Sequence, residues 1–367
     1  MQRCPLCAGE IEDAAMKCRH CESDLTGTMT LQPAGLPTTA RHDAGIACAS
    51  QSSTEAAVPV PVFAMPRGRA VTAADLGWNP IAQTLVVGQL ALVAAVALCL
   101  RWTPLPMAWT TASVQLATIG GLSALWMVLY QTPGRSRRDW VIAESIAALI
   151  LLVSGSLILG AGQYVVALWH RPLVDSSLAA ADAALGVSVP ALVAWMRPHS
   201  WLTAGARLAY FSLLPQFILA LVGTGVVLRD RTRLWEFLFH FHVCALVTLI
   251  CSGLFPAACA FTYYGVESLL DQTRFINHFS ALRAGTLRVL DFSNIEGLIS
   301  FPSFHVAGAL MVTWAFRGYR AWVWPLVVLN AALIAATVLL GAHYAIDLFA
   351  TVGVFAGSVA VHRRTIR

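Results

Sequence analysis

Charge of either sign is scarce in this sequence, and lysine is almost absent. Only 12% of the 367 residues are charged, and Lys17 is the single lysine, whereas soluble domains carry about 25% charged residues. With 57% hydrophobic residues and a mean hydropathy of +0.68, the chain has too little polar surface to form one soluble globule. Uninterrupted apolar runs of about 20 residues, the length that an α-helix needs to cross a bilayer, predict a multi-pass membrane protein instead.

The cysteines do not have the distribution of a disulfide scaffold. Four of the nine lie within the first 21 residues, and most of the others are scattered through apolar runs. The first four form two Cys-x-x-Cys pairs separated by ten residues: Cys4, Cys7, Cys18 and Cys21. Four thiolates satisfy tetrahedral zinc, and the pattern resembles a zinc ribbon. We expect residues 1–26 to hold one structural zinc ion, with a redox pair of dithiols as the alternative.

Composition divides the rest of the chain into two further regions. Residues 27–78 are rich in Ala, Thr, Pro and Ser, which indicates a flexible linker. Residues 79–367 form the membrane domain. The predicted fold class is therefore an all-α, polytopic membrane helix bundle of about eight spans with a small N-terminal zinc ribbon. The predicted spans are 81–100, 107–130, 141–168, 208–228, 237–261, 301–316, 321–340 and 344–361. The polar, proline-broken stretch 172–200 is expected to be an interfacial amphipathic helix.

The arginines predict the orientation of the membrane domain. They follow the second, fourth, sixth and eighth predicted spans, at positions that include Arg137, Arg229, Arg317 and Arg363. Because short basic loops face the cytoplasm, we expect both termini there, with the membrane being a bacterial inner membrane. The loops after spans three, five and seven then lie outside. Because the arginines lie mostly in short loops between apolar runs, they indicate membrane orientation, and no nucleic-acid partner is expected.

Two short motifs near the C-terminal end place ionisable residues at helix starts. His305 and His343 each begin a predicted span, 38 residues apart, which fits one helix, a tight turn and one helix back. Both imidazoles therefore return to the same membrane face. Asp347 follows His343 at i+4, where a carboxylate orients the ring. Ser303 lies at a helix start, which favours phosphate binding. The alternative is a set of interfacial polar residues that are each bonded to a neighbour.

These motifs resemble those of a known family. Pro302-Ser303-x-His305 and His343-x-x-x-Asp347 are similar to the second and third signature motifs of the type-2 phosphatidic acid phosphatase superfamily. The segments 283–285 and 296–305 resemble most its inositolphosphotransferase branch, which is related to inositol-phosphorylceramide synthases. The resemblance covers about 170–361, and it implies a catalytic core in that part of the membrane domain.

The resemblance implies a role for each of four residues. His343 would attack the phosphorus and form a phosphohistidine, with Asp347 orienting its ring. His305 would protonate the leaving oxygen, and Ser303 with nearby N–H groups would hold the phosphoryl oxygens. No metal or other cofactor is expected for catalysis. We therefore expect a phosphatase or phosphotransferase that acts on a lipid-linked phosphate at the outer membrane face.

The sequence departs from the superfamily pattern at two phosphate-binding cations. The lysine of the first motif has no counterpart in the membrane domain, and Ala336-Thr337 stands where the third motif usually has Ser-Arg. Arginines of the predicted outer loop 262–300 are candidate substitutes: Arg283 first, then Arg274 and Arg288. Each of them is equally compatible with a solvated loop charge. The missing cations favour the transferase branch, in which an alcohol rather than water accepts the phosphoryl group.

Two other functions stay open at this point. A lipid transporter would show paired ionisable groups at mid-membrane or an internal repeat, and the sequence shows neither. A catalytically silent membrane anchor, whose zinc ribbon recruits a cytoplasmic protein partner, is compatible with the missing cations. The intact set of serine, histidines and aspartate argues against it. A substitution of His343 that changes a phospholipid pool would separate the enzyme from both alternatives.

Overall fold

The computed structural model describes residues 2–3, 10–11, 80–103, 105–131 and 137–365. These residues belong to two units, a short pair of strands and a set of helices. Strand β1 (Gln2–Arg3) pairs antiparallel with strand β2 (Glu10–Ile11). The four cysteines of the predicted zinc ribbon and the predicted linker, 27–78, lie outside the described residues, so both stay predictions.

The second unit is helical, as its apolar runs predict. Six of its described helices are long and apolar enough to cross a membrane. They are α1 (Pro80–Arg101), α2 (Trp109–Gln131), α3 (Arg137–Ala167), α8 (Arg231–Leu254), α12 (Arg320–Leu339) and α13 (Ala345–Thr365). Each overlaps a predicted span. Three shorter helices are α9 (Ala260–Tyr264), α10 (Thr273–Arg283) and α11 (Phe304–Ala315), and α11 is shorter than the predicted span 301–316.

Two pairs of helices are bent. Helices α6 (Ser200–Phe211) and α7 (Leu213–Val222), with a π-helical turn at Gly223–Val227, form a pair bent by 44°. Helices α4 (Asp175–Ala184) and α5 (Val189–Met196) form a pair bent by 78°. If each pair is one span, up to eight of the described segments are long and apolar enough to cross a membrane. The number agrees with the predicted number of about eight, but the set differs. The predicted span 301–316 contains only the short helix α11, which is not counted, and the pair of α4 and α5 in 172–200 is counted instead.

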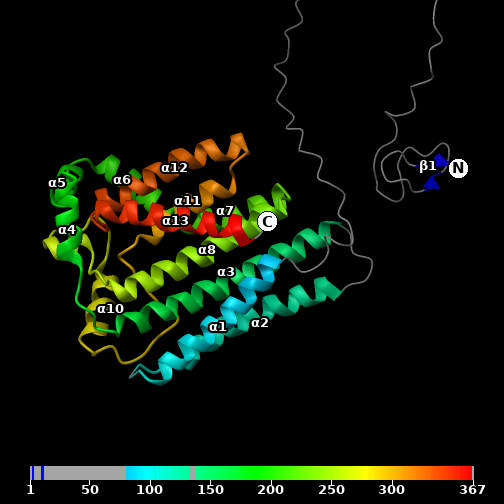
Figure 1. Cartoon of the computed structure of the whole chain (residues 1–367), viewed down its shortest axis with the longest axis horizontal. Coiled ribbons are helices and arrows are strands. Elements are labelled where there is room, and N and C mark those ends of the chain that lie inside the picture. The colour runs from blue at the N-terminus through cyan, green and yellow to red at the C-terminus, as the bar shows by residue number, and fades with distance from the viewer. Residues whose placement is uncertain (1, 4–9, 12–79, 104, 132–136, 366–367) are drawn as a thin grey trace, which may run out of the picture. The chain divides into compact units, whose positions relative to one another are not determined.

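The prediction of a single interfacial helix over 172–200 is wrong, because the chain turns sharply between α4 and α5. Gly186 adopts a φ of +71° after the end of α4, a left-handed conformation that favours glycine. Pro190 lies in the first turn of α5, where its fixed φ suits a helix start. Asp175 and Asp182 are buried rather than exposed on a polar face. Figure 1 shows α4, α5 and α10 gathered at one end of the helical unit.

Helix α8 is the central helix of this unit. It packs against α3, α11 and α13, and more of its length is buried than in the other five long helices. Phe237, Leu238 and Phe241 of α8 share one hydrophobic core with Phe217 of α7 and Met311 of α11. Helices α1 and α2 both pack on α3 along one flank (Figure 1) and keep most of their residues exposed.

The basic ends of three helices gather around one buried carboxylate. Glu236, near the start of α8, pairs with Arg233 and with Arg317, which follows α11. His362, near the end of α13, lies 3.9 Å from the same carboxylate. The start of α8 and the ends of α11 and α13 therefore share one end of the helical unit, which we call the basic end. The two sequence motifs, at the starts of α11 and α13, lie at the opposite end.

Candidate active site

The first motif forms the start of α11. Ser303 is the N-cap residue of this helix, and its Oγ accepts a hydrogen bond from the backbone N–H of Val306 at 3.4 Å. Such a cap satisfies one of the free N–H groups of a helix start. His305 follows in the first turn. The hydroxyl of Thr351 on α13 donates to the carbonyl oxygen of Ser303 at 3.3 Å, which links the two motifs.

The second motif lies in the turn from α12 to α13. Gly341 has a φ of +86° there, and a Cβ at this position would lie 3.1 Å from Val193. A residue with a side chain would therefore be strained at this point. The backbone N–H of His343 donates to the carbonyl oxygen of Thr337 at 3.0 Å. The turn thus delivers His343 to the start of α13, where Asp347 occupies the first turn.

The structure brings the serine, His343 and the aspartate into one hydrogen-bonded series. Asp347 Oδ2 lies 3.1 Å from His343 Nδ1 and accepts a second bond from the backbone N–H of Tyr344 at 3.1 Å. A carboxylate at Nδ1 assigns the ring proton to that atom. The lone pair of Nε2 then faces Ser303, whose hydroxyl lies 3.3 Å away. All three side chains are buried.

His305 lies beside this series and has a partner that the sequence did not reveal. Its ring centroid is 6.3 Å from that of His343. On α6, the ring of Tyr210 stacks on the His305 imidazole, with 4.1 Å between the centroids and an interplanar angle of 22°. Tyr210 is buried, so the stacking fixes the plane of a ring that otherwise rotates about its side-chain bonds.

A cavity of about 280 Å³ lies beside the two imidazoles. His305 and His343 both line it. Most of its other lining side chains are apolar, and they include side chains from α3, α7, α8 and the segment before α11: Leu159, Leu214, Phe217, Phe241, Leu249 and Ile299. Ionisable groups next to an apolar cavity suit an amphiphilic ligand with one polar end.

Two buried carboxylates of α4 hold the turn that carries His343. Asp182 accepts hydrogen bonds from the backbone N–H groups of Ala345 and Ile346, at 2.9 and 2.8 Å. Both N–H groups lie at the start of α13 and have no partner within the helix, and a negative charge there also interacts favourably with the helix dipole. Asp175 accepts from the hydroxyl of Tyr344 at 2.9 Å. Sequence reasoning missed both aspartates; the signal that could have found them is the presence of ionisable residues among small apolar ones in 172–200.

The structure places none of the three candidate arginines in the lining of this cavity. Arg274 forms an ion pair with Glu296 at 2.6 Å. Arg283 donates to the backbone carbonyl oxygen of Arg171 at 3.1 Å. Arg288 is exposed. The four residues of the two motifs are thus brought together, whereas the arginines lie on the segment around α10.

The order of these parts is that of a known superfamily. A family model described as the PAP2 superfamily matches residues 176–361, which is about half of the chain. The chain belongs to the PAP2 superfamily. The matched segment runs from α4 to α13, so it contains both motifs and the carboxylate of Asp182. No curated protein and no solved structure matches the chain.

Membership of the PAP2 superfamily points to a phosphatase or phosphotransferase that acts on lipid phosphates, because members are typically phosphatases. The six long apolar helices fit a multi-pass membrane protein of this superfamily. The match names the superfamily and no branch within it. Helices α1, α2 and α3 precede the matched segment.

Proposed function

We propose that this protein transfers or hydrolyses a lipid-linked phosphate through a phosphohistidine intermediate on His343. The observation that carries the proposal is the series from Ser303 Oγ to His343 Nε2 and from His343 Nδ1 to Asp347 Oδ2. This arrangement leaves the lone pair of Nε2 buried, beside the hydroxyl of Ser303 and the imidazole of His305. A neutral imidazole that is oriented by a carboxylate is an activated nucleophile.

The reaction has two balanced steps. First, Nε2 of His343 attacks the phosphorus, the P–N bond forms, and the P–O bond to the leaving oxygen breaks while His305 gives that oxygen a proton. Second, the oxygen of water or of an alcohol attacks the phosphorus, the new P–O bond forms, the P–N bond to His343 breaks, and the attacking oxygen gives its proton to His305. Asp347 stabilises the positive charge that the His343 ring carries between the two steps. Both histidines then regain their starting states.

The phosphoryl oxygens need donors and cations. We assign the donors to Ser303 and the N-terminus of α11, which is a favourable place for an anion. For the cations we propose Arg283 first, with Arg274 and Arg288 as further candidates, because all three lie on the segment 273–288 that includes α10. No step requires a metal ion, since the imidazole itself is the nucleophile.

The cavity supports one class of substrate. Its apolar lining supports a substrate with hydrocarbon chains, so that the phosphate lies at the imidazoles and the chains lie between α3, α7 and α8. Two cations of the superfamily's phosphatase motifs have no counterpart in the motifs here. This supports transfer to an alcohol, as in the inositolphosphotransferase branch, over simple hydrolysis.

The cellular setting completes the proposal. The arginines of the basic end support a cytoplasmic position for that end, and the active site would then face the outside of a bacterial inner membrane. Cys4, Cys7, Cys18 and Cys21 would bind one structural zinc ion in the cytoplasm. The ribbon would offer a surface for a cytoplasmic protein partner.

The test compares the lipids of a deletion strain that carries the wild-type protein or His343→Ala. We expect one phosphate-bearing lipid pool to be restored by the wild type and not by His343→Ala, as measured by mass spectrometry of lipid extracts. His199→Ala is the matched control, because His199 is a histidine outside the site that bonds to the backbone of Trp195. Full restoration by His343→Ala would contradict the proposal and favour a silent anchor or a transporter.

A further inference from the structure

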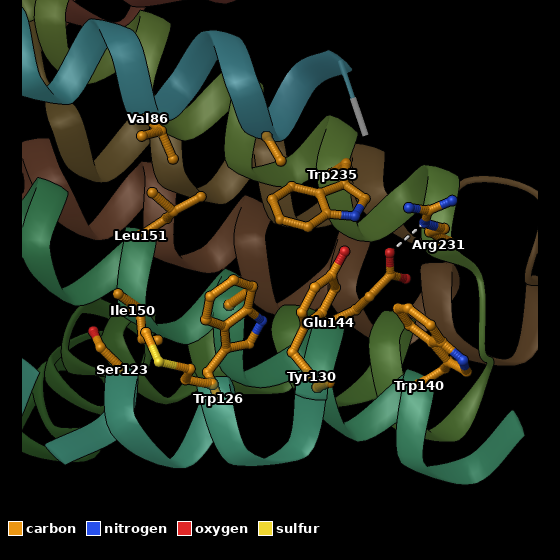
Figure 2. A pocket seen from close by; sticks show the side chains of 14 residues that line it. Val86, Ser123, Trp126, Tyr130, Trp140, Glu144, Ile150, Leu151, Arg231 and Trp235 are labelled. Carbon is orange, nitrogen blue, oxygen red and sulfur yellow. Dashed lines mark ion pairs between the residues drawn. The ribbon is translucent and has the colours of Figure 1, made fainter. Parts of the chain in front are cut away.

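A second cavity lies at the basic end, away from the two motifs. It measures about 220 Å³ and lies among α1, α2, α3 and α8 (Figure 2). Four aromatic side chains line it: Trp126, Tyr130, Trp140 and Trp235. The ion pair between Glu144 of α3 and Arg231 of α8 lines the same cavity, and Figure 2 shows it beside the aromatic rings. Apart from its α8 residues, this lining precedes the segment that the PAP2 family model matches.

A larger, mostly apolar cavity adjoins the first. It measures about 860 Å³ and extends along α1, α2 and α3. The two cavities share Val86, Ile150 and Leu151 in their linings. A cavity of this size falls in the range of pockets that bind small organic ligands, about 300–1,000 Å³. Together the two cavities offer one polar, aromatic end and one long apolar body.

We propose that these two cavities bind one zwitterionic phospholipid, with its head group at Glu144 and Arg231 and an acyl chain along α1–α3. An ammonium group is attracted to aromatic faces and to a carboxylate. The Tyr130 ring stacks on Trp126 at 5.1 Å and meets Trp140 edge to face at 5.6 Å, so these rings form a wall beside Glu144. The guanidinium of Arg231 suits the phosphate, which it binds through a planar fork of donors.

The charges of the site favour a head group without net charge. Glu144 and Arg231 neutralise each other, and their side chains are only 22% and 33% exposed. A zwitterion adds no net charge, and it can place its phosphate at Arg231 and its ammonium at Glu144. An anionic head group would add an uncompensated negative charge next to Glu144 in an apolar surrounding, which is costly.

This lipid is distinct from the substrate. Arg231 begins α8 at the basic end, whereas His305 and His343 lie at the opposite ends of α11 and α13. The bound lipid would fill the space between α1, α2 and α3 and hold these three helices on α8. The proposal does not depend on the chemistry of His343.

The test uses the full-length protein in detergent with phosphatidylcholine, phosphatidylethanolamine or phosphatidylglycerol of identical acyl chains, and native mass spectrometry as the readout. We expect one molecule of a zwitterionic lipid to be retained about tenfold more strongly than phosphatidylglycerol, which is the ratio that one favourable ionic or cation–π contact provides. Retention of both zwitterionic lipids means that the site binds an ammonium group whether or not it is methylated. Retention of only one of them shows whether the site prefers the methylated or the unmethylated ammonium. Equal or stronger retention of phosphatidylglycerol would overturn the proposal.

Two variants locate the site. Glu144→Gln removes the carboxylate, so we expect about tenfold weaker retention of the zwitterionic lipids and a shift of preference towards phosphatidylglycerol at Arg231. Tyr130→Leu removes part of the aromatic wall and keeps both residues of the ion pair, so it tests the site if Glu144→Gln does not fold. Glu267→Gln is the matched control, because Glu267 pairs with Arg197 on the exposed surface at 2.9 Å. Wild-type retention and selectivity in Tyr130→Leu would refute the site.

Discussion

At the scale of single residues, the proposed nucleophile depends on one hydrogen bond on the far side of its ring. Asp347 Oδ2 lies 3.1 Å from His343 Nδ1. We expect Asp347→Asn to keep the fold and to lower kcat about 10²–10⁴-fold, as the loss of an orienting carboxylate does in catalytic triads. The amide no longer stabilises the charged ring. Steady-state kinetics on the purified protein measures this, and Asp271→Asn, at an exposed aspartate before α10, is the control. A kcat near wild type would remove Asp347 from the mechanism.

We expect a different kinetic effect from the candidate arginines, because they would bind the phosphate and take no part in proton transfer. Arg283→Ala should raise KM by about tenfold or more with a smaller effect on kcat, since it loses a charge-assisted contact. Arg283→Lys should restore only part of the binding, because the planar fork is lost. The same pair of substitutions at Arg274 and Arg288 ranks the three candidates. An unchanged KM in Arg283→Ala would assign Arg283 to its contact with the Arg171 backbone alone.

Sequence reasoning reached the residues of the two motifs, which one helix and its return bring to the same face, and missed their partners from earlier segments of the chain. The i+4 spacing of His343 and Asp347 predicts their contact because a helix places them on one face. Tyr210 stacks on His305 from 95 positions away, and Asp182 reaches the start of α13 from more than 160 positions away. Local periodicity carries no information about such contacts. Only the three-dimensional packing of α4 and α6 against the two motifs reveals them.

At the scale of helices, α4 stabilises the start of α13 through hydrogen bonds. Asp182 accepts two backbone hydrogen bonds from Ala345 and Ile346, and an asparagine there can accept only part of that pattern and carries no charge. We expect Asp182→Asn to destabilise the protein by about 1–3 kcal/mol, the cost of a buried donor without its partner, and to lower kcat because the turn with His343 shifts.

Thermal unfolding and kcat together measure the effect of Asp182→Asn. Asp271→Asn serves again as the control, because Asp271 accepts a single backbone hydrogen bond at an exposed position. Unchanged unfolding and unchanged kcat in Asp182→Asn would show that α13 starts without help from α4.

The long helices were predictable and the bent pair of α4 and α5 was not, for a physical reason. Helices α1, α2, α3, α8, α12 and α13 are encoded by apolar runs that the bilayer itself selects. The pair of α4 and α5 contains aspartates and a proline, so its sequence has the composition of a surface helix although Asp175 and Asp182 are buried. Burial there is compensated by hydrogen bonds to another segment, and composition alone does not show such compensation.

At the scale of the whole molecule, the proposal separates the zinc from the catalysis. We expect about one zinc per chain, lost when Cys4 or Cys18 is changed to Ser, and catalytic turnover that survives chelators because an imidazole is the nucleophile. Metal analysis and activity assays of the purified protein before and after chelation measure both. Loss of turnover by chelation in a variant without residues 1–26 would mean that the membrane domain itself uses a metal ion.

The central claim is the covalent intermediate on His343, and trapping it is the most direct test. The purified protein is mixed with a lipid substrate that carries a radioactive phosphate and is quenched in alkali within the first turnover. The account predicts phosphate on the wild-type protein that is stable in base and labile in acid, mapped to His343 by peptide mass spectrometry and absent from His343→Ala. Turnover with no phosphate bound to the protein, or undiminished turnover by His343→Ala, would contradict it.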